Sequence, residues 1–276
     1  MAGTGIDPIR YRPWTGKRTA KRERILVISN TLFRKKMRSK WVILLMVLGY
    51  LGVWAIPIIF NSLNAHESLD RETMAEQMGS EIFFLFTVLL ASLVCSDTIS
   101  EDLRSNSFVL YFSRAIRKED YLAGKILGIF MAMALFCLVP AVIMAAALLG
   151  TQYGSDYLGG FGVLGLTAVA GLATTLFLIP ISLMISSFTA RKSFAAIGTF
   201  MTFFVLGIIG SIFAEFDANW SMIDPGSLLA YFSDWLYGLG IPNDVSGGLL
   251  VAMICIFTAV PLALVYLRIR NKAVGK

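Results

Sequence analysis

The sequence predicts an all-α membrane protein with six transmembrane helices. Hydrophobic residues make up 57% of the chain and charged residues only 15%, whereas a soluble domain carries about 25% charged residues. The charge-free stretches have the length of membrane spans, and the basic residues gather on one side of the six-span topology. These three observations predict the fold class.

Six stretches are long and apolar enough to be considered as spans, because a helix needs about 20 apolar residues to cross the hydrocarbon of a bilayer. The second stretch is short, with 15 residues between Glu81 and Asp97. It crosses if the helix extends at both ends and the flanking carboxylates reach the interface. The predicted spans cover residues 41–60, 82–96, 126–150, 163–188, 193–214 and 245–267.

The distribution of Lys and Arg decides that the second stretch crosses. With six spans, residues 1–40, 97–125, 191–192 and 268–276 face one side and carry 12, 5, 2 and 4 basic residues, which is 23 of the 24 in the chain. Without the second crossing, the split would be 12 against 12. The positive-inside rule therefore predicts a multi-pass protein of the cell membrane with both termini cytoplasmic.

The first 40 residues form a cytoplasmic N-terminal segment ahead of a transmembrane domain that covers residues 41–276. Within residues 20–40, Ile25, Ile28, Leu32 and Phe33 recur at helical spacing and are surrounded by Lys and Arg. This pattern predicts an amphipathic N-terminal interfacial helix that lies on the cytoplasmic leaflet. The alternative is a basic tail that only fixes the topology.

Several function classes are disfavoured by what the predicted spans lack. No Asp, Glu, Lys, Arg or His is central in a span, which argues against a self-powered transporter, and no phosphate-binding loop motif is present. Cys95, Cys137 and Cys255 fall inside spans without metal-ligand spacing, so we expect buried apolar side chains and no metal site. We expect no catalytic residue and no bound cofactor. The basic residues bracket the spans, so we expect no nucleic-acid partner.

The loop between the second and third spans contains an apolar patch, residues 108–112, flanked by Arg104 and Arg114. Exposed apolar patches with a charged rim usually serve as docking surfaces, so the patch predicts a cytoplasmic protein partner. The alternative is a patch that dips into the lipid interface.

This loop resembles the corresponding loop of ABC-2 type permeases, the membrane subunits of ATP-binding-cassette exporters. Their pattern is roughly E-x-x-x-G-T-L-x-x-L-L-S-x-P-I-S-R-x-x-Y-L-x-G-K. Ser105, Asn106 and Ser107 replace its Gly-containing turn. The matching positions are Glu101, Leu110, Ser113, Ile116, Tyr121, Leu122, Gly124 and Lys125.

The resemblance implies a cytoplasmic coupling helix that inserts into a separate ATPase subunit. That subunit would bind ATP and Mg, and a second permease subunit would complete a homo- or heterodimer in the lipid bilayer. The function implied is ATP-driven export, and the uncharged spans suggest an apolar or amphiphilic substrate. The alternative is a non-transporting scaffold or assembly subunit. The expected docking residues are Arg104, Ser105, Asn106, Phe108, Val109, Tyr111, Phe112 and Arg114.

The outer loop, residues 215–244, predicts an interfacial or re-entrant helix. Asp224 followed by Pro225 is a typical helix start. By resemblance to ABC-2 permeases, the apolar face that follows forms an outer gate helix, with Leu228, Phe232 and Trp235 on it. The alternative is a loop that only anchors in lipid.

Small residues at Gly207, Gly210, Ser211 and Ala214 in the fifth span have the four-residue spacing that lets helix backbones approach closely. They predict a packing seam, either inside one protomer or between two.

Overall fold

A computed structural model of the chain describes residues 20–63, 71–112, 116–151, 157–241 and 245–273. All regular structure within these ranges is helical. Residues 1–19 of the predicted N-terminal segment lie outside the described ranges, as does Arg114 of the predicted docking set.

Six helical rods are long and apolar enough to cross a membrane, which confirms the predicted fold class. The short second stretch reaches crossing length because the rod continues past Ser96 to Arg104. In chain order the rods are α2 (Lys40–Gly49) with π-helical η1 (Tyr50–Ala55) and α3 (Ile56–Leu63); α5 (Glu81–Ser96) with α6 (Ser100–Arg104); α8 (Lys118–Cys137) with α9 (Val139–Thr151); α10 (Tyr157–Phe188); α11 (Lys192–Ala214); and α13 (Gly247–Ala273). The shorter helices are α1 (Lys21–Met37), α4 (Arg71–Gly79), α7 (Ser107–Phe112), 3-10 helix η2 (Ala218–Ile223) and α12 (Pro225–Tyr237).

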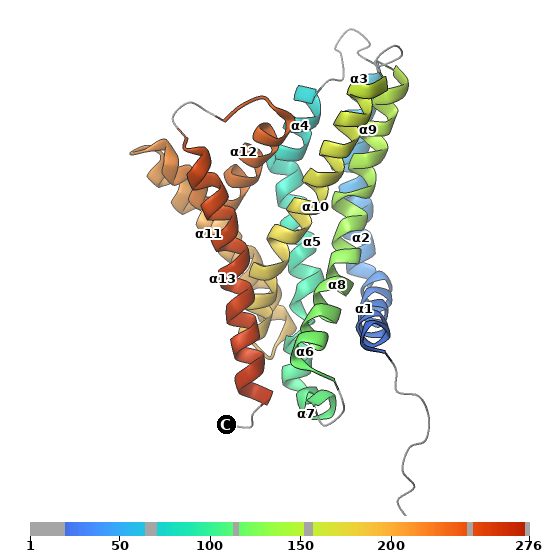
Figure 1. Cartoon of the computed structure of the whole chain (residues 1–276), viewed down its shortest axis with the longest axis vertical. Helices are drawn as coiled ribbons and strands as arrows, with labels where there is room; N and C mark the ends of the chain where they lie inside the picture. The colour runs from blue at the N-terminus through green and yellow to red at the C-terminus, as the bar shows by residue number, and fades with distance from the viewer. Residues whose placement is uncertain (1–19, 64–70, 113–115, 152–156, 242–244, 274–276) are drawn as a thin grey trace, which may run out of the picture.

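The bundle has two chemically different ends (Figure 1). One end carries α1, α6, α7 and the close of α13, and it holds most of the Lys and Arg residues; we name it the basic end. The opposite end carries α4 and α12, and we name it the acidic end. The first and last described helices therefore share one end, as six crossings require.

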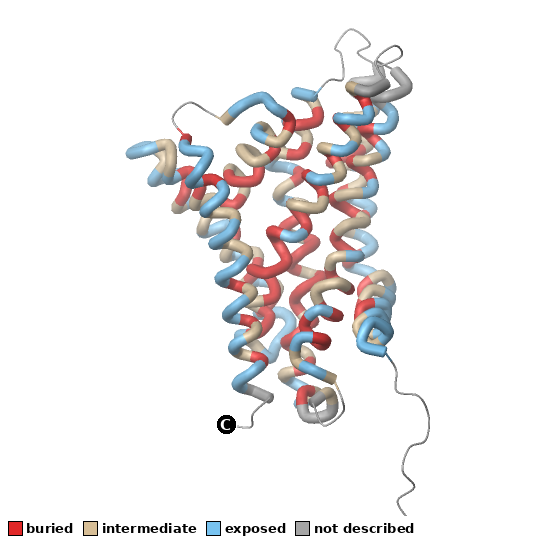
Figure 2. Tube along the Cα trace, in the orientation of Figure 1, coloured by how far each residue is buried: buried red, intermediate tan, exposed pale blue. Residues whose placement is uncertain are grey.

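The spans α5 and α10 occupy the centre of the bundle (Figure 2). In their most apolar windows 61% of residues are buried, against 17% for α11 and for α13. Hydroxyl groups inside α10 bond carbonyls of their own helix, as Thr174 does with Ala170 at 2.9 Å. Cys95 and Cys137 are buried as expected, but Cys255 on α13 is exposed. That expectation was wrong because α13 is peripheral and turns much of its surface outward.

A helix, α1, forms at the position predicted for the N-terminal interfacial helix. Figure 1 views α1 nearly along its axis while the spans run up the picture, so α1 lies across the bundle. Its apolar face is covered by α8: Leu32 is buried, and glycines on α8 allow the close approach. A Cβ built on Gly124 would lie 2.9 Å from the Ile28 side chain, and one on Gly128 would lie 2.8 Å from the Ser29 carbonyl oxygen.

Candidate functional site

The two short helices α6 and α7, residues 100–112, form a compact unit at the basic end, which we name the α6–α7 unit. The turn between them depends on Asn106, which has a left-handed backbone with φ of 52°. Asn tolerates this conformation better than most residues. It stands where the permease pattern has its Gly-containing turn. The Ser105 hydroxyl supports the turn by donating to the Glu101 carbonyl at 2.8 Å.

The predicted docking residues divide between surface and interior. Arg104, Ser105 and Asn106 are exposed. Phe108 is only 7% exposed, and its ring packs edge-on against Tyr121 of α8 with centroids 5.7 Å apart. Tyr111 is half-buried and lies 5.2 Å from the same Tyr121 ring.

The expectation that Phe108 forms part of an exposed patch is therefore wrong. Tyr121 provides an apolar surface within the same chain, and Phe108 is buried against it. The side chains of Val109 and Phe112 lie outside the described part of the structure. Among the described residues, the exposed surface of the α6–α7 unit is therefore polar, and it is formed by Arg104, Ser105 and Asn106. The aromatic ring of Phe108 in the same unit packs against Tyr121.

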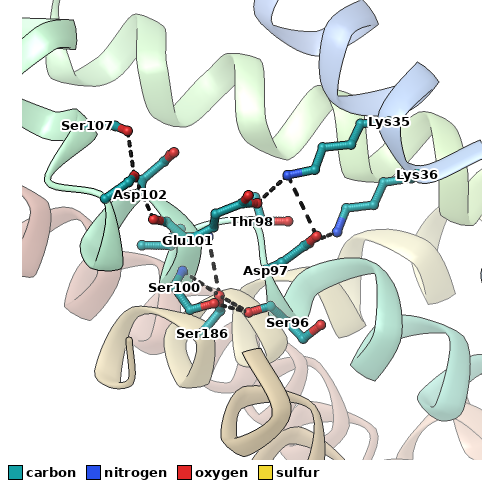
Figure 3. Close-up of polar contacts among 12 residues, drawn as sticks. Lys35, Lys36, Ser96, Asp97, Thr98, Ser100, Glu101, Asp102, Ser107 and Ser186 are labelled. Atoms are coloured by element: carbon teal, nitrogen blue, oxygen red, sulfur yellow. Dashed lines mark hydrogen bonds and ion pairs between the residues drawn. The ribbon is translucent and has the colours of Figure 1, made fainter. Parts of the chain in front are cut away.

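Ion pairs fasten the α6–α7 unit to α1 (Figure 3). Lys36 pairs with Asp97, and Lys35 pairs with Glu101 and lies 3.9 Å from Asp97. The Lys36 side chain is only 3% exposed, and burial lowers its pKa from 10.5 to about 7. The pairing therefore joins a buried amine to the turn between α5 and α6.

A second set of polar contacts fastens the unit to α8. Asp102 is buried and pairs with Lys125 at 2.8 Å, and it accepts a 2.5 Å hydrogen bond from the Tyr121 hydroxyl. Lys125 also donates to the Thr98 carbonyl at 2.9 Å. Each buried charge in this set has an opposite charge or a carbonyl dipole beside it, as buried charges require.

The start of α1 is tied to α8 as well. Lys21 lies 3.3 Å from Asp120, whose side chain is fully buried. The helices α1, α6, α7 and α8 are thus linked by charge and by ring contacts into one assembly at the basic end. A force applied to the α6–α7 unit would reach two membrane spans, α5 and α8, directly.

At the acidic end, the predicted start of the outer helix is confirmed to the residue. Asp224 caps α12 by accepting hydrogen bonds from the backbone amides of Gly226 and Ser227 at 3.0 and 2.9 Å. Pro225 follows in the first turn. The helix ends at Gly238, with φ of 79°, which is a left-handed C-terminal cap.

The predicted gate residues on α12 do not share one environment. Leu228 is fully buried, Phe232 is half-buried and Trp235 is 51% exposed. The helix is packed against α4, where a Cβ on Gly79 would lie 3.2 Å from the backbone of Ala230. This contact joins α12 to the helix that leads into α5.

A groove of about 660 Å³ lies between α5, α11 and α12. Its lining is mainly apolar and aromatic, with acidic groups at Glu81 and Asp224. The predicted small-residue seam borders it: a Cβ on Gly210 would lie 2.6 Å from the Asp224 backbone nitrogen. The side of the seam that carries Gly210 therefore packs inside the protomer, while Ser211 is exposed.

Several residues of the basic end were missed by the sequence reasoning. The spacing of Gly124 and Gly128 is a known indicator of close helix approach and could have predicted the α1–α8 contact. The pairing of Lys36 with Asp97 joins residues 61 positions apart, and no local pattern indicates it. Ser186 of α10, which contacts the turn between α5 and α6, has no sequence indicator either.

Among the described residues, no group of three or more His, Cys, Asp or Glu side chains is arranged so that it could hold a metal ion.

Comparison with known families gives one match that covers most of the chain. A family model described as "ABC-2 family transporter protein" matches residues 26–273. Comparison with curated proteins gave no match. Permeases of this family are generally the non-catalytic membrane components of ABC transporters and work with an ATP-binding subunit. The chain therefore belongs to the ABC-2 transporter family and is a multi-pass membrane permease.

Proposed function

We propose that this chain is the permease subunit of an ATP-driven exporter, energised by a separate ATPase that docks on the α6–α7 unit. The observation that carries the proposal is the attachment of this unit to the membrane helices. Ion pairs and ring contacts join it to α1 and α8, and α6 continues the rod of α5. A partner that moves the unit would therefore move spans.

The orientation proposed places the basic end, with both chain termini, in the cytoplasm. The basic residues support this orientation through the positive-inside rule, since 23 of 24 belong to segments on that side. An ATPase that draws on cytoplasmic ATP could then reach the α6–α7 unit.

The chemistry of docking is polar at its surface. Arg104 is exposed and can pair with a carboxylate of the partner, while Ser105 and Asn106 offer hydrogen bonds beside it. ATP and Mg would be bound by the partner, and this chain would supply contacts only. The buried Phe108 and Tyr121 rings would support the docking surface from behind.

The groove between α5, α11 and α12 supports an apolar or amphiphilic substrate. Its volume of about 660 Å³ lies within the roughly 300–1,000 Å³ of known ligand sites. Its aromatic lining would favour the apolar part of a substrate, and the carboxylates of Glu81 and Asp224 would favour a polar head group. In this proposal α12 acts as an outer gate over a path shared with a second permease subunit.

Co-purification of the tagged full-length chain from its native membrane tests the proposal. We expect an ATPase with a phosphate-binding loop to be retained, and Arg104→Glu to reduce its retention at least tenfold. Arg270→Glu, also exposed at the basic end, is the matched control and should retain the partner.

Equal retention of the ATPase by both variants would overturn docking on the α6–α7 unit. Recovery of an assembly that contains no ATPase would favour the alternative, a scaffold or assembly subunit.

A further inference from the structure

The rod formed by α5 and α6 is interrupted between Ser96 and Ser100. In a continuous α-helix the amide of Ser100 would donate to the carbonyl of Ser96, four residues earlier. Here the hydroxyl of Ser186, from α10, lies between these two groups (Figure 3). It donates to the Ser96 carbonyl at 3.0 Å and accepts from the Ser100 amide at 3.3 Å. It also accepts from the Ile99 amide at 3.3 Å.

The hydroxyl of Ser186 therefore bridges the two backbone groups of a missing helical hydrogen bond, and the Ser96 carbonyl accepts from the Ser100 hydroxyl as well. A side chain inserted into the backbone ladder in this way is a recognised cause of a helix break. Ser186 is fully buried, and Ile99 and Ser100 are 1% and 0% exposed. In such a site, backbone groups that lose a partner have no ready replacement from water.

The residues of the break are also held from two other helices. Lys125 of α8 donates to the Thr98 carbonyl at 2.9 Å, and Lys36 of α1 pairs with Asp97. Because the turn is fixed on these sides, removal of the Ser186 hydroxyl should free the two amides instead of letting the helix close on itself.

We propose that Ser186 is a positioning residue that fixes the angle of α6 and links it to α10. This inference rests on the proposed function: a displacement of the α6–α7 unit by the ATPase would reach the fourth span through this hydroxyl. Lys125 and Lys36 link the same break to α8 and α1. Lys125 reaches the Thr98 carbonyl and Lys36 reaches the Asp97 carboxylate, whereas Ser186 bonds both the Ser96 carbonyl and the Ser100 amide, the two groups of the missing helical hydrogen bond.

The adjacent Ser187 provides a matched control. It is 1% exposed, and its hydroxyl donates to the Met184 carbonyl of its own helix at 2.6 Å. Ser187→Ala removes the same atom from the same helix at nearly the same burial, but it leaves the break between α5 and α6 unchanged.

Hydrogen exchange of the purified full-length chain tests the contact without reference to any partner. We expect the amides of Ile99 and Ser100 to exchange about tenfold faster in Ser186→Ala, the effect of losing one net hydrogen bond. Ser187→Ala should exchange like the wild type. Unchanged protection of these amides in Ser186→Ala would overturn the inference.

The coupling role is tested in the complex with its ATPase. A Cys255→Ser background removes the exposed cysteine, and Ser211→Cys places a reporter in the groove. The rate of maleimide labelling is compared without nucleotide and after vanadate trapping. We expect vanadate trapping to change the labelling rate at least threefold in the wild type and in Ser187→Ala. In Ser186→Ala, vanadate trapping should leave the labelling rate unchanged, although ATP hydrolysis is retained.

A nucleotide response that persists in Ser186→Ala would overturn the coupling role, and so would loss of complex assembly in that variant, which would indicate a merely structural residue. If the wild-type chain itself retains no ATPase or shows no response to nucleotide, the proposed function fails. The exchange result distinguishes that failure from a failure of the contact at Ser186.

Discussion

Among single residues, Lys36 is the buried charge at the place where α1 meets the turn after α5. Lys36 is almost fully buried and pairs with Asp97, which is 23% exposed and also lies near Lys35. Burial lowers the pKa of Lys36 to about 7. Breaking such a pair from the carboxylate side leaves a buried amine, whereas removing the amine leaves a carboxylate that water and Lys35 can reach.

Asp97→Ala should therefore destabilise the protein more than Lys36→Met does. Between the lowered pKa of about 7 and the ordinary value of 10.5, folding releases the proton of Lys36, so stability rises with pH across this window and falls as pH drops towards 7. We expect Asp97→Ala to cost about 2–3 kcal/mol at pH 6 and less at pH 9. Melting temperatures in detergent at both pH values measure this. An equal loss of stability at pH 6 and pH 9 would contradict the lowered pKa of the buried Lys36 amine.

Asn106 supports a second prediction at this scale. A β-branched side chain at its φ of 52° costs about 1–2 kcal/mol, so Asn106→Val should lower the melting temperature and weaken retention of the ATPase. Asn106→Gly is the control and should match or exceed the wild type. If both variants behave alike, the left-handed turn has no part in shaping the α6–α7 unit.

Which residue-level features could be predicted depends on how local they are. The start of α12 at Asp224 and Pro225 was predictable because a helix cap is encoded by adjacent residues. The burial of Phe108 was not, since Tyr121 lies outside the apolar run and meets it only after the chain folds back. The bridge from Ser186 to Ser96 spans 90 positions and depends on the packing of α10 against α5.

Among the helices, α1 and α8 can approach closely because α8 has glycine, which carries no side chain, at Gly124 and Gly128. A Cβ on Gly128 would lie 2.8 Å from the Ser29 carbonyl oxygen and 3.0 Å from Leu32. Backbone atoms cannot move aside as a flexible side chain can, so the helices must separate if a larger residue is introduced.

Gly128→Ala should accordingly cost about 1–3 kcal/mol through overpacking. Thermal unfolding of the detergent-purified protein measures this, and proteolysis after α1 should become faster. Gly165→Ala on α10 is the control, because a Cβ at that position meets nothing within 4 Å. Equal stability of the two variants would show that α1 is not seated on α8 as described.

The elements differ in how far the sequence predicts them. Five of the spans are evident from length and hydropathy, and the second is recovered from charge because the alternative splits the basic residues evenly. The sequence marks the end of the apolar run at Ser96 but not the broken helix beyond it, because Ser100 and its neighbours have no helix-breaking residue. The break exists because α8 and α10 provide partners for its backbone.

At the scale of the whole molecule, the two ends have distinct chemistry joined by a central pair of spans. The α6–α7 unit lies at the basic end and α12 at the acidic end (Figure 1). Ion pairs hold the α6–α7 unit, and the groove lies between α5, α11 and α12. The spans α5 and α10 run between these ends, and their apolar windows are equally buried and more buried than those of the other described rods. This arrangement suits a permease in which a movement imposed at one end must appear at the other.

Site-specific photo-crosslinking in the native membrane can show whether a separate ATPase contacts the α6–α7 unit. In the test variant a photoreactive amino acid replaces the exposed Ser105. In the control variant it replaces Trp220, which is exposed on the 3-10 helix after α11. We predict that position 105 crosslinks to a protein with a phosphate-binding loop and ATPase activity, and that position 220 does not. If position 220 crosslinks to that ATPase, or if position 105 crosslinks to no ATPase, docking of the ATPase on the α6–α7 unit is contradicted.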